Sequence, residues 1–126
     1  AGGFAVIKDI YKTLVYRLCH YRNSISDVIP ERMLTRAPTA NETEQFDQDT
    51  LPPYEVLDTI VRMFMEENRS VGEIVKNGYN TTVVERIVRL MRINEYKRRQ
   101  APIGIRITPR GFGRDWRCPI TSKYRD

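Results

Sequence analysis

The chain has 126 residues, of which 40% are hydrophobic and 29% are charged, and it carries a formal net charge of +5. These values fit one soluble globular domain with a modest core, and no apolar run is long enough to cross a membrane. The charge is uneven, because residues 94–126 hold nine lysines and arginines against three acids, which leaves −1 on the rest of the chain. A basic tail on a near-neutral body indicates a polyanionic partner.

The cysteines and the histidine argue against a metal site. Cys19, Cys118 and His20 do not have the spacing of zinc ligands. The stretch from Ala1 to Ile7 has no basic region ahead of its apolar residues, so no secretory signal is visible. We therefore expect a cytoplasmic protein with two reduced thiols, although the two cysteines could pair in principle.

The first helix is predicted over residues 9–22. Pro30 suits the first turn of a short helix near 30–35, and Pro38 ends it because the residue before a proline avoids helical geometry. The apolar stripe that predicts the first helix consists of Ile10, Leu14, Val15, Leu18 and Tyr21.

A long acidic stretch follows at residues 36–58. It contains six acids and no base after Arg36, and it lacks apolar periodicity until its end. A loop of this length is either functional or a solvated linker, and composition alone does not choose between them. Pro52-Pro53 marks the point at which the next helix begins.

Two helices are predicted after this loop. The first spans 53–68 and carries a wide apolar stripe, which is typical of a core helix. Ser70 and Glu73 form a capping box that opens a short helix over about 71–77, and Gly78 is its C-cap. The stripe of the longer helix consists of Val56, Leu57, Ile60, Val61, Phe64 and Met65.

A third main helix is predicted from about 81 to 98. A capping box of Thr82 and Glu85 would open it, with Asn80 and Thr81 as alternative caps. Its basic last turn complements the helix dipole. The residues expected to face inward are Val83, Val84, Ile87, Val88, Met91 and Tyr96.

The remaining residues, 99–126, form a basic tail that is rich in glycine and proline and has no sustained period. Ile103, Ile105 and Ile107 alternate and predict one short strand. Phe112 and Trp116 are expected to anchor the tail on a surface. The fold class predicted for the chain is therefore mainly α.

Three segments of the acidic stretch carry a family resemblance. Residues 37–40 read Ala-Pro-Thr-Ala, residues 45–49 read Gln-Phe-Asp-Gln-Asp, and residues 51–58 read Leu-Pro-Pro-Tyr-Glu-Val-Leu-Asp. Together they closely resemble the substrate loop of NAD synthetase. The Leu-Pro-Pro-Tyr form, the Tyr-Lys-Arg-Arg-Gln stretch at 96–100 and the closing segment 106–121 resemble the long, glutamine-dependent type. The matches cover nearly the whole chain.

The resemblance implies a fold and an activity. It implies the C-terminal helical part of an α/β fold of the adenine nucleotide α-hydrolase type, divided into helices at 1–36, an acidic substrate loop at 37–52, helices at 53–98 and a basic tail at 99–126. The family is a ligase that uses ATP and magnesium to adenylate the nicotinate carboxylate of deamido-NAD. Ammonia released from glutamine by a separate domain then displaces AMP.

The resemblance also implies binding residues. Lys8 and Thr39 match residues that contact ATP, and Tyr96 and Lys97 match a pair that contacts deamido-NAD. Tyr96 stands where the short enzymes have histidine. Further contacts from the loop are expected from Asp47 and Gln48, the second of which replaces the usual glutamate and so lacks its charge.

Several parts of the enzyme have no counterpart in the sequence. The Ser-Gly-Gly-x-Asp-Ser pyrophosphate loop, the upstream magnesium-binding acid and the glutaminase nucleophile are not found. We therefore assign no catalytic residue and no metal ligand, and expect a C-terminal fragment that is inactive alone. Its expected partners are the missing half of the synthetase domain, the glutaminase domain and further copies of the protein, with no membrane.

Composition alone permits a different function. A helical module could use the arginines and aromatic rings of the tail, Phe112, Arg114, Trp116 and Arg117, to stack bases or to bind an acidic protein. The resemblance disfavours this reading, because it accounts for the tail as part of an enzyme.

Overall fold

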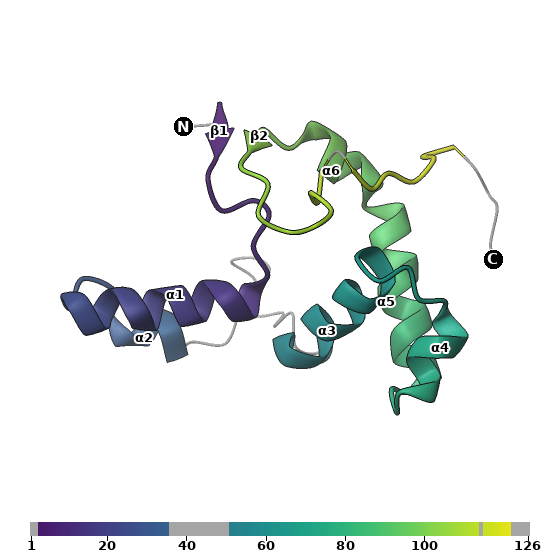
Figure 1. The fold of residues 1–126 in the computed structure, drawn as a ribbon, viewed down its shortest axis with the longest axis horizontal. Coiled ribbons are helices and arrows are strands. Elements are labelled where there is room, and N and C mark those ends of the chain that lie inside the picture. The colour runs from purple at the N-terminus through teal and green to yellow at the C-terminus, as the bar shows by residue number, and fades with distance from the viewer. Residues whose placement is uncertain (1–2, 36–50, 114, 122–126) are drawn as a thin grey trace, which may run out of the picture. The chain divides into compact units, whose positions relative to one another are not determined.

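The computed structural model describes residues 3–35, 51–113 and 115–121 (Figure 1). The described residues belong to two compact units. One is formed by residues up to Ile10 together with those from Ile60 onward, and the other by residues 11–59. The elements in chain order are β1 (Phe4–Ala5), α1 (Lys12–Ile25), α2 (Glu31–Thr35), α3 (Tyr54–Met65), α4 (Val71–Lys76), α5 (Thr81–Ile93), α6 (Glu95–Gln100) and β2 (Ile103–Gly104).

Helix α1 begins at Lys12, three residues after the predicted start at Asp9. Its N-cap, Tyr11, is extended and makes no side-chain capping bond, and the Thr13 N–H instead donates to Asp58 Oδ2 on α3 at 2.8 Å. A carboxylate at this end of a helix satisfies a free N–H group and complements the positive end of the dipole. The cap of α1 therefore comes from a residue far away in the sequence.

The turn after α1 is organised by Asn23. Its Nδ2 donates to the Ile29 carbonyl at 2.8 Å, and its Oδ1 accepts from the N–H groups of Ile29 and Val28 at 3.0 and 3.3 Å. Helix α2 follows at Glu31–Thr35, in agreement with the short helix predicted near 30–35.

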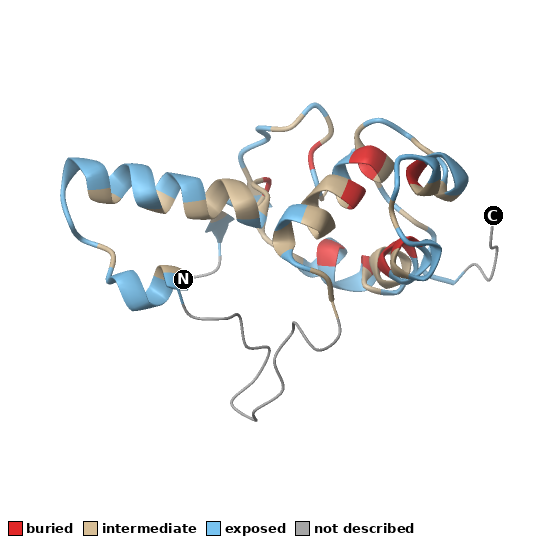
Figure 2. Ribbon diagram, turned by 90° about the horizontal axis from the view of Figure 1, so that it is seen from below, coloured by how far each residue is buried: buried red, intermediate tan, exposed pale blue. Residues whose placement is uncertain are grey.

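The buried apolar residues lie on α3, α4 and α5, within the unit that includes residues from Ile60 onward. Helices α1 and α2 have no buried residues (Figure 2). Helix α4 packs on α5, and α5 packs on α6. Met63 and Met65 of α3 are buried, whereas Phe64 between them is partly exposed. The core consists of Ile60, Met63, Met65, Ile74, Val84, Ile87 and Val88.

The capping box predicted at Ser70 and Glu73 is confirmed. The Ser70 N–H donates to Glu73 Oε2 at 2.8 Å, and the Glu73 N–H donates to Ser70 Oγ at 3.3 Å. The C-cap of α4 is Asn77, so the prediction of Gly78 as the C-cap is wrong by one residue. Gly78 follows it with a φ of +96°, a left-handed conformation that side chains disfavour. The sequence therefore fixes both ends of α4 locally.

The capping box predicted at Thr82 and Glu85 is wrong. Helix α5 begins at Thr81, and its N-cap is Asn80, one of the two alternatives. Asn80 Oδ1 accepts from the N–H groups of Thr82 and Val83 at 2.9 and 3.4 Å. Because the N-cap lies two residues before Thr82, Thr82 falls in the first turn of the helix and needs an acceptor for its own N–H.

The single helix predicted over 81–98 is interrupted. Asn94, with φ −89° and ψ 11°, separates α5 from α6, and its side chain donates to the Leu90 carbonyl at 2.9 Å. The inward placement of Tyr96 is also wrong, because 45% of this residue is exposed. The spacing of the buried face continues instead onto Glu95 and Arg98.

The strand predicted from the alternating isoleucines is shorter than expected. Only Ile103 and Gly104 are paired, in parallel with Phe4 and Ala5 of β1. The backbone N–H groups of Ile107 and Thr108 donate to the Asp9 carboxylate, so they are not available to a strand ladder. The predicted fold class, mainly α, is confirmed, and the described residues also form a two-stranded sheet. None of the described helices is long and apolar enough to span a membrane.

Candidate functional site

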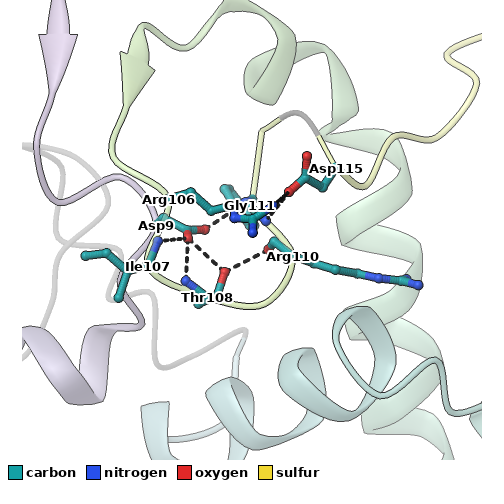
Figure 3. A network of polar contacts seen from close by, with 8 residues as sticks. Asp9, Arg106, Ile107, Thr108, Arg110, Gly111 and Asp115 are labelled. Atoms are coloured by element: carbon teal, nitrogen blue, oxygen red, sulfur yellow. Dashed lines mark hydrogen bonds and ion pairs between the residues drawn. The ribbon is translucent and has the colours of Figure 1, made fainter.

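The Asp9 carboxylate joins the segment after β1 to the tail (Figure 3). Asp9 Oδ2 accepts from the N–H groups of Ile107 and Thr108 and from the Thr108 hydroxyl, each at 2.8 Å. Asp9 Oδ1 accepts from the Phe112 N–H at 2.7 Å. We call Asp9 and these donors the Asp9 clamp. It fixes the loop between 107 and 112 through one side chain.

The environment of Asp9 favours its charged form. Only 6% of the residue is exposed. Burial raises the pKa of the carboxyl, but the hydrogen bonds from the Thr108, Ile107 and Phe112 N–H groups and from the Thr108 hydroxyl hold the pKa below its usual range. Asp9 is therefore an anion whose charge is stabilised by hydrogen-bond donors from the tail.

Lys8 lies beside this clamp, against the backbone of the tail. Its Nζ donates to the Pro102 carbonyl at 2.8 Å. A Cβ at Gly104 would collide with the Ala5 carbonyl, and a Cβ at Gly113 would come within 2.6 Å of Lys8 Nζ. Glycine at both positions thus allows the tail to close around the lysine side chain. An ammonium has three donors, so this contact is compatible with a further acceptor.

The tail carries two more polar attachments. Asp115 Oδ2 accepts from Arg106 Nη1 at 3.1 Å and from the Gly111 N–H at 2.9 Å, which closes the turn of the tail seen in Figure 3. Arg110 Nη1 donates to the Met65 carbonyl at 3.2 Å and to Asn68 Oδ1. The tail is therefore tied to the end of α3 as well as to Asp9.

The two residues expected to contact deamido-NAD both lie on the exposed side of α6. Tyr96 and Lys97 are exposed, and Lys97 Nζ lies 6.0 Å from the centre of the Tyr96 ring. The other side of the helix carries Glu95 and Arg98, which are 1% and 7% exposed. The structure thus brings a cation and a phenol together at a surface that a ligand can reach.

Glu95 is charged despite its burial. Burial raises the pKa of its carboxyl, but a hydrogen bond from the Cys118 N–H and the neighbouring Arg98 and Arg99 guanidinium groups hold the pKa below its usual value. Buried charges of this kind persist where they are paired and hydrogen-bonded.

The remaining residues expected at the site cannot be located. Thr39, Asp47 and Gln48 lie outside the described residues. Lys8, Tyr96 and Lys97 belong to the same unit. Within the described ranges no three His, Cys, Asp or Glu side chains are grouped as a metal would require. We assign magnesium no step at these residues.

Three residues that organise this region were not predicted from the sequence: Asp9, Glu95 and Arg98. A signal was available for two of them, because positions 84, 88, 91, 95 and 98 continue one helical stripe. Because charged residues are mostly exposed, Glu95 and Arg98 did not look like members of a buried stripe. No local signal identifies Asp9, whose partners lie about a hundred residues away in the sequence.

The tail aromatics are engaged within the unit. The Phe64 and Trp116 rings meet edge to face with centres 5.5 Å apart, and the Arg98 guanidinium lies 5.4 Å from the centre of Phe112 and 5.0 Å from that of Trp116. The expected anchoring role of Phe112 and Trp116 is confirmed. Because their faces meet a buried arginine, this arrangement disfavours a base-stacking surface. Cys19 and Cys118 are unpaired thiols, as predicted.

Comparison with known proteins identifies the family. A sequence model of the NAD synthase family matches residues 1–101. A glutamine-dependent NAD(+) synthetase from Aquifex aeolicus is 54% identical over 98% of this chain, and one from Thermotoga maritima is 48% identical over 100% of it. In each case the match covers 22% of the relative.

A solved structure agrees with these matches. The glutamine-dependent NAD+ synthetase from Acinetobacter baumannii, in complex with ADP, aligns with 94% of this chain at 47% identity and a TM-score of 0.54. The aligned part is 20% of that protein, so the chain spans about a fifth of the length of the relatives it matches. On the match to residues 1–101 and these identities, the chain belongs to the NAD synthase family.

Proposed function

We propose that this chain is the C-terminal part of the synthetase domain of a glutamine-dependent NAD synthetase. The intact enzyme adenylates the nicotinate carboxylate of deamido-NAD with ATP, and ammonia from glutamine then displaces AMP to form the amide. The observation that carries the proposal is the extent of the match, because about half of the residues are identical to enzymes of that name over nearly the whole chain. The ADP complex of a relative supports a nucleotide as ligand.

The roles proposed for individual residues follow from the resemblance and from their positions. Tyr96 and Lys97 contact deamido-NAD, which their exposure on α6 supports. Lys8 and Thr39 contact ATP, and Asp47 and Gln48 are further contacts from the loop. Lys8 Nζ already meets the Pro102 carbonyl, so we expect it to reach a phosphate with a second donor.

The bond-forming machinery is proposed to lie elsewhere in the intact enzyme. The sequence has no pyrophosphate loop of the Ser-Gly-Gly-x-Asp-Ser type and no glutaminase nucleophile. This chain then contributes contacts that position both substrates, which lowers the entropic part of the barrier. Magnesium, assembly into a homo-oligomer and a cytoplasmic location stay predictions.

The test is the substitution Lys97→Ala in the intact enzyme. Removing a charged hydrogen bond costs about 1.5–3 kcal/mol, so KM for deamido-NAD should rise about tenfold or more while KM for ATP changes little. Lys76→Ala is the control, because Lys76 is an exposed lysine at the end of α4 in the same unit. An unchanged KM and rate for deamido-NAD in Lys97→Ala would contradict the assignment.

A further inference from the structure

Helix α6 has two opposite faces. Successive residues of an α-helix are rotated by about 100°, so positions 95 and 98 share one side and positions 96 and 97 share the other. In α6 the first pair, Glu95 and Arg98, is buried, and the second pair, Tyr96 and Lys97, is exposed. The direction in which Lys97 points is therefore set by what holds Glu95 and Arg98.

Arg98 is held from several sides. Its Nη2 pairs with Glu95 Oε2 and donates to the Met91 carbonyl at 3.1 Å, which ties α6 to the end of α5. Its guanidinium lies over the rings of Phe112 and Trp116. Arg98 Nε has no hydrogen-bond partner among the described residues, so the ring faces supply the remaining favourable contacts.

Glu95 ties the same helix to the end of the tail. Besides Arg98, it accepts from Arg99 Nε at 3.4 Å and from the Cys118 N–H. Arg99 in turn donates through Nη2 to the Cys118 carbonyl at 3.0 Å. The tail segment 112–118 is thus attached to α6 by charged groups at both of its ends.

A helix of six residues needs this support. So short a helix is not stable in water through its own hydrogen bonds. The break at Asn94 also uncouples α6 from the continuous backbone ladder of α5. The α6 clasp, which we define as Glu95, Arg98, Phe112 and Trp116, is therefore what fixes the orientation of the helix.

We propose that Glu95, Arg98 and Trp116 are positioning residues for deamido-NAD, which they influence only through the orientation of Tyr96 and Lys97. The inference rests on the proposed function of that pair. Glu95 and Arg98 are too deeply buried to meet a ligand that arrives from solvent. Their effect must therefore appear in the binding of the substrate that Lys97 contacts, and not in the binding of ATP.

The first experiment compares two matched carboxylates in the intact enzyme. Glu95 lies between Arg98 and Arg99, and its side chain is 1% exposed. Glu67 lies between Arg62 and Arg69, at 3.7 and 2.7 Å, and its side chain is 36% exposed. Each is replaced by glutamine, which keeps the shape and one acceptor oxygen but removes the charge.

Glu95→Gln should raise KM for deamido-NAD about threefold to tenfold and leave KM for ATP within about twofold of the native value. Glu67→Gln should leave both constants unchanged, because an exposed ion pair contributes little. Equal changes in the two constants for Glu95→Gln would refute a positioning role and leave only a structural one.

The second experiment tests whether the clasp acts through Lys97. Trp116→Leu removes a ring from Arg98 without leaving a buried charge unpaired, so it provides a folded variant should Glu95→Gln fail to fold. Trp116→Leu should raise KM for deamido-NAD about threefold in the native background and have no further effect in Lys97→Ala. Additive effects in the double variant would overturn the inference.

The two proposals fail in different ways. If the intact native protein does not convert deamido-NAD, the proposed function is wrong, and if Lys97→Ala changes nothing, the role proposed for Lys97 is wrong. If Lys97→Ala raises KM for deamido-NAD but neither Trp116→Leu nor a folded Glu95→Gln raises it, the proposed function stands and the positioning role is wrong.

Discussion

Helices α1 and α5 both carry apolar stripes, but only α5 buries its stripe. Val84, Ile87 and Val88 of α5 are at most 4% exposed. On α1 no residue is buried, and Leu18 and Tyr21 are 44% and 66% exposed. The two helices thus differ in what covers them, and the apolar stripe of α1 is also the less pronounced of the two.

The contrast between α1 and α5 shows what an apolar stripe determines. A stripe fixes which face of a helix gains free energy when it is covered, because burial removes apolar area from water. For α5 the cover is supplied by α4 and α6. Within the described residues of its own unit, α1 receives only partial cover, such as the contact of the Tyr16 and Tyr54 rings, whose centres lie 6.3 Å apart.

The largest effect expected is the loss of all activity when this chain is separated from the rest of the enzyme. The 126 residues contain no pyrophosphate loop, so they cannot align an attack on the α-phosphate of ATP. An assay for AMP and pyrophosphate with added ammonia bypasses the glutaminase, and the intact enzyme is its positive control. Turnover by the separate chain above the buffer blank would contradict the view that the chemistry lies outside it.

The next largest effect is expected from a direct comparison of substitutions at apolar residues on α5 and α1. Ile87→Ala on α5 should lower the free energy of unfolding by about 2–5 kcal/mol, because it leaves a cavity in a closed core. Leu18→Ala on α1 should lower it by about 1 kcal/mol or less, because the side chain is already partly hydrated. Urea unfolding of the intact protein measures both.

Equal losses for Ile87→Ala and Leu18→Ala would contradict this difference between the helices. They would show that the remainder of the intact protein covers α1 as completely as α4 and α6 cover α5.

A substitution in the Asp9 clamp is expected to have an effect of intermediate size. Asp9→Asn should weaken the clamp by about 1.5–3 kcal/mol, because an amide nitrogen replaces one of the oxygens that accept from the tail. Hydrogen exchange of peptides covering 107–112 in the intact protein should show the loss of protection. Asp27→Asn, at an exposed aspartate after α1, is the control and should leave these peptides unchanged.

The contribution of Asp9 should depend on pH. Because its folded pKa is lowered, the stabilisation is complete above the ordinary pKa of about 4 and is lost as the pH falls through the folded value. The difference in protection between the native protein and Asp9→Asn should therefore be constant near neutral pH and shrink in acid. A difference that grows in acid would have the wrong sign for a lowered pKa.

The smallest effect expected concerns the helix caps. Ser70→Ala should destabilise α4, and Asp58→Ala should destabilise α1, each by about 1 kcal/mol, because each removes an acceptor from a first-turn N–H. Thr82→Ala, at the capping box that does not form, should have little effect. Exchange of the first-turn amides measures all three. Equal destabilisation by Thr82→Ala would show that Asn80 is not the cap of α5.

Much of the helical structure could be predicted because its signals are local. The ends of α4 follow from Ser70, Glu73 and Gly78, and the start of α3 follows from Pro52-Pro53, since capping bonds and backbone preferences act over a few residues. The order of the helices and the mainly helical class were predictable for the same reason. The break at Asn94 was missed, because asparagine inside an apolar period gives a weak signal.

The candidate site was predictable only in part. The resemblance gave the identities of the binding residues, of which Lys8, Tyr96 and Lys97 can be located. It gave no account of how Lys97 is oriented, because Glu95 and Arg98 look like surface charges in the sequence. A charged pair can occupy core positions only where partners from other elements satisfy it, and a helical pattern does not reveal those partners.

Local sequence signals specified where α3 and α4 begin and which helix faces are apolar, because these features depend on neighbouring residues and on helical spacing. The contacts between residues far apart in the chain depend on the tertiary fold. Asp58 caps α1, Asp9 binds the tail, and Arg98 lies against Phe112 and Trp116. Each of these contacts requires a polar or charged group to find partners that only folding brings near, because an unpaired buried charge is too costly to persist.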